Sequence, residues 1–246
     1  MMRDFLAALG FLTRLPVPLH VFDDGRAGAR SLPWYPAVGA SIGAMLWLLV
    51  WLLGRWPPLL SAALLLLAWV TVTGALHLDG LADSADAWIG GIGDRERTLA
   101  IMKDPRCGPA GVVALVLVLL LKFAALASLP RAGSAALVLA PMLARAGLTL
   151  AFMTTPYVRP QGMGSRLREA PPAACRIALA VVVGAALSCG WHGLLALAVA
   201  GAVFALWRHA CLKRLGGFTG DTCGALTELV EAAVLVALVA AAAASG

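Results

Sequence analysis

Apolar segments follow one another along almost the whole chain, with short connections between them. A hydrocarbon core of about 30 Å requires about 20 helical residues, and seven segments approach this length: 37–53, 59–77, 110–129, 134–153, 177–190, 193–208 and 224–244. Hydrophobic residues form 61% of the chain and charged residues 13%, against about 45–50% and about 25% in soluble domains. A soluble core in a chain of 246 residues cannot bury this much apolar surface. We therefore predict an all-α, polytopic integral membrane bundle of about seven spans, in a single domain over residues 1–246.

The predicted fifth and sixth spans are the shortest, and Gly190 separates them, so a tight or re-entrant hairpin is an alternative to two full spans. Ahead of the first span, the segment DFLAALGFLTRLPVP (residues 4–18) places Phe5, Leu9 and Leu12 at helical spacing before Pro16 ends the pattern. One apolar face on a short helix is typical of an amphipathic helix that lies in the membrane interface. We expect such a helix at the N-terminus.

The basic residues are distributed unevenly between the predicted spans. The segments 1–36, 78–109, 154–176 and 208–223 contain 15 of the 19 Lys and Arg residues, and the opposite connections contain only Arg55 and Arg131. Because Lys and Arg are enriched in cytoplasmic loops, we predict a multi-pass protein of the cell (inner) membrane with a cytoplasmic N-terminus. The net charge of +6 follows from this topology. The basic residues are not interleaved with aromatic residues, so the sequence gives no indication that the chain binds nucleic acid.

None of the 13 Asp and Glu residues lies in a predicted outside connection, so the acidic motifs gather at the cytoplasmic face. The first motif is LHLDGLADSADAWIGG, residues 76–91. On a helix, Asp79, Asp83 and Asp86 fall within an arc of about 60°. Three carboxylates this close repel one another unless a cation neutralises them, and oxygen ligands suit Mg²⁺ or Mn²⁺. We predict a metal site here rather than a solvated acidic face, and a packing role for His77 in preference to a ligand role.

The second motif is GGFTGDTCGALTELVEA, residues 216–232. Gly216, Gly217 and Gly220 permit a tight backbone that can approach phosphate oxygens, and Thr219, Asp221 or Thr222 can cap the last helix, whose N-terminus favours an anion. On that helix Asp221, Glu228 and Glu231 share an arc of about 80°. Ionisable residues inside a span indicate a functional site by default; a plain helix cap with a structural ion pair is the alternative.

The third motif is RERTLAIMKDPRCGPAG, residues 95–111. Lys103 and Arg106 flank Asp104 immediately before a span, where they can hold a diphosphate, although a positive-inside topology accounts for them equally well. The loop RPQGMGSRLR, residues 159–168, is either a phosphate lid or a flexible connection.

Two cations, Lys122 and Arg145, lie inside predicted spans. An unpaired charge at that depth is costly, so we predict that Arg145 pairs with Glu231 or Glu228. Lys122 either joins this network or extends into a ligand pocket. Both cations are also candidate substrate-binding residues, and Glu228 is a candidate metal ligand.

Four segments together resemble one enzyme family: FLTRLPVP (11–18), HLDGLADSAD (77–86), IMKDPRCGPAG (101–111) and GGFTGDTCGA (216–225). These segments resemble the corresponding motifs of the cobalamin 5′-phosphate synthases, also called adenosylcobinamide-GDP ribazoletransferases. The motifs occur in the same order as in that family, and the resemblance extends over nearly the whole chain. The chain departs from the family's pattern at Ala87, Ala100 and Gln161, which affects mainly the role of residues 159–164.

The resemblance implies a reaction in which α-ribazole or its 5′-phosphate attacks the cobinamide-side phosphate of adenosylcobinamide-GDP, with Mg²⁺ required. The products are adenosylcobalamin or its 5′-phosphate, and GMP. The expected partners are the corrinoid nucleotide, α-ribazole, the lipid bilayer and other enzymes of cobalamin biosynthesis, with the oligomeric state open.

The acidic and glycine-rich motifs take roles that agree with this chemistry. We expect a metal to bind to Asp79, Asp83 and Asp86, with Asp221 as a further ligand. The glycine turn 216–220 with Lys103 and Arg106 would hold the diphosphate. Either Asp86 or Asp221 would accept the hydroxyl proton.

Two competing interpretations fit less well. A CDP-alcohol phosphotransferase requires an Arg after its Gly-Ala step and two late Asp residues four apart, but Asp83 follows Ala82, and Thr98 stands four residues after Asp94. A secondary transporter tends to bind substrate near the midplane at a repeat interface, whereas here the acids gather at one face and no repeat is visible.

Overall fold

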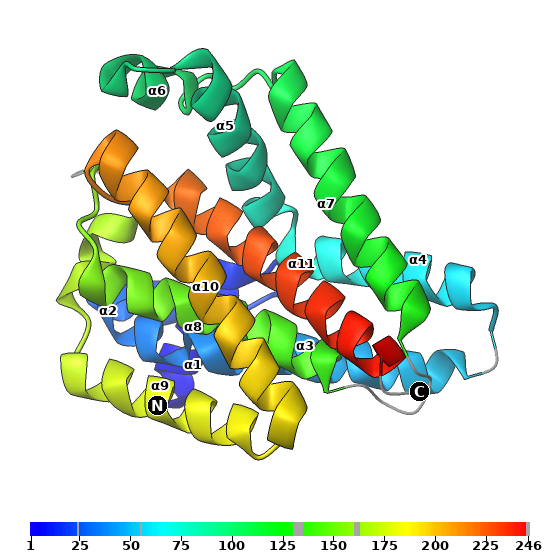
Figure 1. Ribbon diagram of the computed structural model, residues 1–246. Coiled ribbons are helices and arrows are strands. Elements are labelled where there is room, and N and C mark those ends of the chain that lie inside the picture. The colour runs from blue at the N-terminus through cyan, green and yellow to red at the C-terminus, as the bar shows by residue number, and fades with distance from the viewer. Residues whose placement is uncertain (24, 55, 130–134, 160–162, 245–246) are drawn as a thin grey trace.

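The computed structural model describes residues 1–23, 25–54, 56–129, 135–159 and 163–244, and all its regular elements are helices (Figure 1). The longer helices are α3 (Tyr35–Leu53), α4 (Pro58–Thr73), α5 (Leu76–Gly90), α7 (Pro109–Ser128), α8 (Ala136–Thr154), α9 (Pro172–Leu187), α10 (Gly190–Leu215) and α11 (Gly220–Ala244). The shorter elements are α1 (Met2–Leu12), η1 (Leu19–Phe22), α2 (Ala27–Ser31), η2 (Leu32–Trp34), α6 (Arg95–Ile101) and η3 (Met163–Glu169).

The prediction of an all-α membrane bundle is confirmed, although fewer than seven helices meet the requirements for a full span. In the described part of the chain, five helical segments are long and apolar enough: 27–53, α7, α8, α10 and α11. The bent pair α4 and α5 raises the number to six if it counts as one span. The predicted fifth span is α9, a shorter apolar helix of 16 residues, and the predicted sixth is α10, with 26.

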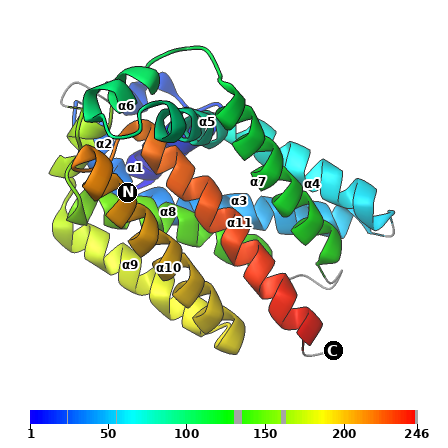
Figure 2. The same ribbon diagram turned by 45° about the horizontal axis from the view of Figure 1, so that its top comes forward.

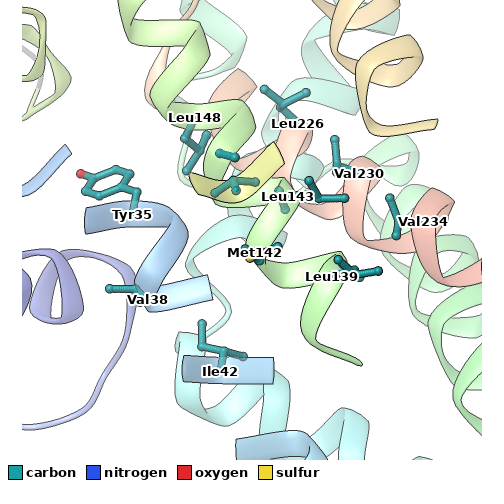
Figure 3. Packing of buried hydrophobic residues seen from close by; sticks show 14 of the residues in the cluster. Tyr35, Val38, Ile42, Leu139, Met142, Leu143, Leu148, Leu226, Val230 and Val234 are labelled. Atoms are coloured by element: carbon teal, nitrogen blue, oxygen red, sulfur yellow. The ribbon is translucent and has the colours of Figure 1, made fainter. Parts of the chain in front are cut away.

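Helix α8 lies between α3 and α11 and forms the centre of the bundle (Figure 3). Val38 and Ile42 of α3 pack toward Met142 of α8, and the opposite side of α8 contacts α11. Gly43 allows the backbones of α3 and α8 to approach, because a Cβ atom there would lie 2.5 Å from the Cα of Val138. Small residues at such crossings permit the close packing on which helix association in membranes depends.

A sharp bend separates α4 from α5. Gly74 ends α4 with φ of 62°, and the next residue, Ala75, has φ of 56°. A left-handed conformation is unfavourable for Ala, and the backbone N–H of Arg14 donates to the carbonyl of Val72 at 2.7 Å next to this turn. The two helix axes consequently differ by 88°. Helix α5, which carries the first acidic motif, therefore points away from α4 (Figure 1).

The N-terminal segment forms helix α1, as the apolar spacing predicts. Ala7, Ala8 and Leu12 are buried, and Phe5 makes an edge contact with Trp34 at a centroid distance of 6.0 Å. The segment after α1 crosses beside the bend between α4 and α5. In the two views the C-terminal ends of α3, α7 and α11 lie toward one end of the bundle, away from α6 (Figures 1 and 2).

Candidate functional site

A pocket of about 440 Å³ opens where the N-terminal ends of α5 and α11 meet. Its polar wall contains Asp79, Asp221 and Arg159. The remaining wall is largely apolar and aromatic and comes from α1, α3, α8 and the segment after α8: Phe11, Leu12, Tyr35, Leu148, Phe152, Tyr157 and Leu167. This pocket thus combines the carboxylates of Asp79 and Asp221 with the basic side chain of Arg159.

The crossing of α5 over α11 brings the two acidic motifs together. A Cβ atom at Gly80 would lie 2.6 Å from the carbonyl oxygen of Asp221 and 3.0 Å from its Cα. At Gly224 a Cβ atom would lie 3.0 Å from the carbonyl oxygen of His77. Only glycine fits a contact of this kind. Because the two backbones touch at Gly80, the neighbouring Asp79 and Asp221 line one pocket.

The carboxylates of both motifs interact electrostatically. The charges of Asp79, Asp221 and Asp86 all act on Asp83, and the charge of Arg159 opposes them. Within the described residues, however, no group of three or more His, Cys, Asp or Glu side chains is close enough together to hold a metal ion. The motif therefore gathers negative charge along α5 and the start of α11 without forming a closed cage of carboxylates.

Asp221 forms an ion pair with Arg159, with 2.9 Å between Oδ2 and Nη1. A short backbone pairing positions this arginine: Phe218 N–H donates to the carbonyl of Pro156 at 2.8 Å, and Val158 N–H donates to the carbonyl of Phe218 at 2.9 Å. The Nε and Nη2 atoms of Arg159 are buried without a hydrogen-bond partner in the described part of the chain. Within the described residues, these two guanidinium nitrogens are thus left without an acceptor. Residues 160–162 of the predicted phosphate lid lie outside the described residues.

The glycine-rich motif forms the turn between α10 and α11. Gly216 ends α10 with φ of 79°. Thr219 and Thr222 then cap α11 reciprocally: each backbone N–H donates to the other hydroxyl oxygen, at 2.8 Å and 3.1 Å. This arrangement is a variant of the capping box. The predicted capping role of Thr219 and Thr222 is thereby confirmed. Gly217 packs against the backbone of Pro156, and Gly220 lines the pocket.

Asp86 contacts the start of α7. Its Oδ2 accepts the N–H of Gly108 at 2.7 Å, and its Oδ1 accepts the N–H of Gly111 at 2.9 Å. A carboxylate at a helix N-terminus satisfies free backbone donors and interacts favourably with the helix dipole. Both oxygens of Asp86 accept a backbone N–H in this way, which gives the residue a role in positioning α7. Asp86 does not line the pocket that contains Asp79 and Asp221, and its roles as a metal ligand and as the base stay predictions.

Lys103 and Arg106 lie in the segment between α6 and α7 and do not line the pocket. Arg106 is bound to Asp104 through Nε at 2.9 Å and Nη2 at 2.7 Å. The hydrogen bonds from Arg106 hold the pKa of Asp104 at about 2, well below its usual range. Thr219 Oγ1 contacts Met102 Sδ at 3.8 Å, which links this segment to the start of α11.

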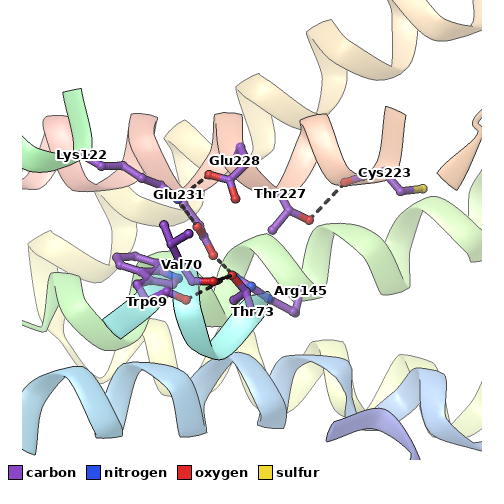
Figure 4. A network of polar contacts seen from close by, with 9 residues as sticks. All are labelled: Trp69, Val70, Thr73, Lys122, Arg145, Cys223, Thr227, Glu228 and Glu231. Carbon is purple, nitrogen blue, oxygen red and sulfur yellow. Dashed lines mark hydrogen bonds and ion pairs between the residues drawn. The ribbon is translucent and has the colours of Figure 1, made fainter. Parts of the chain in front are cut away.

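Four charged side chains form a buried cluster deeper in the bundle (Figure 4). Lys122 Nζ lies 2.6 Å from Glu228 Oε2 and also contacts Glu231, and Arg145 forms an ion pair with Glu231. Lys122 also lies 4.6 Å from the ring centroid of Trp69, at cation–π distance. The predicted pairing of Arg145 with Glu231 is confirmed, and Lys122 joins the network.

This cluster corrects three roles predicted from sequence. Lys122, Arg145 and Glu228 are at most 4% exposed, and their charged groups contact one another rather than the pocket. Buried charges in a membrane protein pair with one another because each alone is costly. Substrate binding by Lys122 and Arg145, and metal binding by Glu228, therefore have no support in this arrangement.

Sequence reasoning did not identify the aromatic wall of the pocket. Tyr35, Phe152 and Tyr157 come from segments distant in sequence, and Phe152 and Tyr157 lie 5.8 Å apart between ring centroids. Burial raises the pKa of the Tyr157 hydroxyl, which therefore remains neutral. Arg159 was considered for a phosphate lid, but its pairing with Asp221 depends on the contact between residues 156–158 and 218, which no local pattern indicates.

The fold and the pocket define a class of protein. The chain is a multi-pass α-helical membrane protein with a pocket of carboxylates and an arginine at the N-terminal ends of two helices. Comparison with known proteins gives the family. The family model for cobalamin-5-phosphate synthase matches residues 4–239, and the chain belongs to this family.

Several relatives that share one name are similar to this chain over nearly its whole length. The adenosylcobinamide-GDP ribazoletransferase of Stutzerimonas stutzeri (strain A1501) is 58% identical over 239 residues, which cover 96% of this chain and 98% of the relative. The protein of that name from Pseudomonas aeruginosa (strain PAO1) is likewise 58% identical over 239 residues, with the same coverage. That from Pseudomonas putida (strain KT2440) is 55% identical over 240 residues, covering 96% and 98%. No solved structure matches the chain.

Proposed function

We propose that this chain transfers the adenosylcobinamide-phosphate group of adenosylcobinamide-GDP to α-ribazole or α-ribazole 5′-phosphate. The products are adenosylcobalamin or its 5′-phosphate, and GMP. Membership of the cobalamin-5-phosphate synthase family and the names of the relatives support this reaction.

One structural observation carries the proposal furthest: Asp79 and Asp221 share a pocket with Arg159, whose buried Nε and Nη2 atoms have no hydrogen-bond partner among the described residues. Arginine donors recognise phosphate oxygens in a paired geometry. Phosphoryl transfer asks a protein mainly for positioning and charge neutralisation. In this pocket the guanidinium group of Arg159 lies beside two carboxylates. These groups can position the phosphate and neutralise charge.

The transfer uses the residues of this pocket as follows. The hydroxyl oxygen of the ribazole forms a bond to the phosphorus of the cobinamide phosphate. The bond from this phosphorus to the bridging oxygen breaks, and GMP leaves with the electron pair. Asp221 accepts the hydroxyl proton, because it lines this pocket, whereas Asp86, the other candidate base, lies at the start of α7. Arg159 binds a phosphate oxygen and keeps Asp221 in place.

We further propose that Mg²⁺, with Mn²⁺ as a substitute, binds to Asp79 and Asp221 in this pocket, with Asp83 adding negative charge nearby. The chemistry of these donors fits the ion, since Mg²⁺ is usually held by one or two carboxylates, water and substrate phosphates rather than by a complete protein cage. When bound, the ion supplies positive charge that stabilises the transferred phosphate.

The proposed orientation places the pocket at the cytoplasmic face of the inner membrane. The basic residues near α6, η3 and the end of α10 support it, because Lys and Arg favour the cytoplasmic side. The C-terminal ends of α3, α7 and α11, which have few basic residues, would then lie outside.

The test is turnover by purified protein in detergent. Adenosylcobinamide-GDP and α-ribazole should yield GMP in equal amount to the corrinoid product, and chelation of divalent cations should stop the reaction. Absence of GMP release under metal-replete conditions, with protein that remains folded, would reject the proposed reaction.

A further inference from the structure

An apolar groove lies between α9, at the edge of the bundle, and the helices α1 and α3 (Figure 1). Its volume is about 730 Å³, within the range of about 300–1,000 Å³ that is usual for small-molecule sites. Two of the residues that line it, Ile177 and Val181 of α9, are 66% and 64% exposed. The groove is therefore continuous with an apolar outer surface of the bundle, which faces the bilayer rather than water.

The groove has the length of one leaflet of a membrane. It follows α9 from Ala174 to Ala185, which at 1.5 Å per residue is about 16 Å. Half of the hydrocarbon core is about 15 Å. Helices α3 and α9 start at the same end of the bundle (Figures 1 and 2), and Trp34, just ahead of α3, lines the groove. Because tryptophan is enriched at the membrane interface, the groove runs from the interface toward the middle of the bilayer.

Two positive charges are held at the interfacial end of the groove. Asp4 Oδ1 accepts a hydrogen bond from Arg30 Nε at 2.9 Å, and Asp4 Oδ2 lies 3.2 Å from the N-terminal ammonium of Met1. All three residues line the groove, and Asp4 and Arg30 are the charged side chains among its described lining residues. One carboxylate between two cations leaves an excess of positive charge. The Arg30 side chain is 38% exposed, so a ligand can reach it.

An anionic phospholipid has the chemistry that such a groove would recognise. An acyl chain is matched to the apolar walls, and a phosphate oxygen accepts strong, charge-assisted hydrogen bonds from a guanidinium or an ammonium group. A zwitterionic lipid adds an ammonium group, for which the described lining offers only Asp4. Both oxygens of Asp4 already contact cations. The charge at this end therefore favours a headgroup that is negative overall.

We propose that this groove binds an acyl chain of an anionic phospholipid and that the phosphate of the lipid contacts Arg30 and the N-terminal ammonium of Met1. The lipid belongs to the leaflet on which the N-terminus lies. Helix α1 connects this site with the candidate functional site, because Phe11 and Leu12 near the other end of α1 line the pocket at the α5–α11 crossing. A lipid bound at the start of α1 thus stabilises one wall of that pocket.

The test measures lipid binding to purified, delipidated full-length protein in a non-ionic detergent by native mass spectrometry. The probes are phosphatidylglycerol and phosphatidylcholine with identical acyl chains. We expect wild type to bind phosphatidylglycerol about tenfold more tightly, the ratio expected from a charge-assisted hydrogen bond. Arg30→Met should remove most of this preference. Arg176→Met, which removes an exposed cation of α9 outside the groove lining, should retain it.

A second pair of variants tests the position of the acyl chain. Ala178→Trp fills the groove, whereas Ala180→Trp places the same side chain at an exposed position of α9 that does not line it. Ala178→Trp should weaken the binding of both lipids, and Ala180→Trp should leave both affinities unchanged. Glycerophosphoglycerol, the headgroup without acyl chains, should bind far more weakly than the lipid.

Equal affinity of wild type for the two lipids would overturn the inference, and this result does not depend on whether any variant folds. An equal loss of preference in Arg30→Met and Arg176→Met would also overturn it, because the lipid would then be attracted by the basic face as a whole. Unchanged lipid binding by folded Ala178→Trp would place the lipid elsewhere on the bundle and reject the groove as its site.

Discussion

Arg145 on α8 and Glu231 on α11 form an ion pair in which neither side chain is exposed. Removal of Arg145 leaves Lys122 to compensate both Glu228 and Glu231, so the buried cluster keeps one negative charge in excess. Breaking a buried ion pair typically costs about 3–5 kcal/mol. We expect Arg145→Met to lower the thermal unfolding temperature of the detergent-solubilised protein markedly, and the double variant Arg145→Met, Glu231→Gln to recover part of the loss. Arg176→Met, at an exposed position on α9, is the control. Simple addition of the two single effects would show that the pair contributes no coupling.

Asp83→Asn tests the acidic face of α5. The substitution retains the size of the side chain and removes a charge that Asp79, Asp86 and Asp221 repel. The folded state should therefore persist, while activity falls by about 10² or more because charge stabilisation of the transferred phosphate is lost. Raised Mg²⁺ should restore part of the rate. Glu96→Gln on α6, whose side chain is 80% exposed, should have no effect. A fully active Asp83→Asn, Asp86→Asn double variant would exclude this site from the mechanism.

Asp86 should behave differently from Asp83, because its oxygens accept the N–H groups of Gly108 and Gly111. Asp86→Ala removes a helix cap, for which losses of about 0.5–2 kcal/mol are usual. Asp86→Asn, which retains one acceptor oxygen, should lose less. Thermal unfolding and turnover per folded molecule are the measurements. A variant of unchanged stability but abolished turnover would restore the catalytic role that the sequence suggested.

The α5–α11 crossing predicts contrasting effects for two glycines. In Gly80→Ala the new Cβ atom would meet the backbone of Asp221 at 2.6–3.2 Å, so the helices must separate. Both stability and activity should fall. In Gly201→Ala on α10 nothing lies within 4 Å of the new atom, and stability should rise by about 0.5–1 kcal/mol through helix propensity. Unaltered activity of Gly80→Ala would show that the crossing does not position the site.

The orientation can be tested with a native cysteine. Cys107 is exposed in the segment before α7, so a membrane-impermeant maleimide should label it in inverted vesicles and not in intact cells. A cysteine introduced at the exposed Trp56, in Trp56→Cys, should show the opposite pattern. Labelling of Cys107 from outside the cell would contradict the proposed cytoplasmic pocket.

The sequence predicted the features that depend on local pattern. The helices follow from apolar length, and the cap of α11 from Thr219 and Thr222, two of the three residues predicted as candidates for it. The pairing of Arg145 with Glu231 was also predictable, because both charges lie at a similar depth in different spans and each requires a partner.

The features that sequence reasoning missed depend on how separate helices meet. The bend at Gly74 and Ala75 was hidden within a continuous apolar segment that read as one span. The shared helical arc of Asp79, Asp83 and Asp86 was correct, but the partner of Asp86 belongs to α7. Likewise, Asp221 and Glu228 share one side of α11 but have different surroundings. Asp221 lines the pocket, whereas Glu228 belongs to the buried charge cluster deeper in the bundle.

The buried charge cluster also constrains how the protein is made. Its cations lie on α7 and α8, and its acids lie on α11, which is synthesised after both. While the earlier helices enter the membrane, Lys122 and Arg145 lack these acids, so the nascent bundle carries two uncompensated charges in hydrocarbon. Insertion of α11 neutralises them and at the same time delivers Asp221 to the pocket. Assembly of the pocket is thus coupled to insertion of α11, and a chain that stops before α11 lacks the acids that neutralise Lys122 and Arg145.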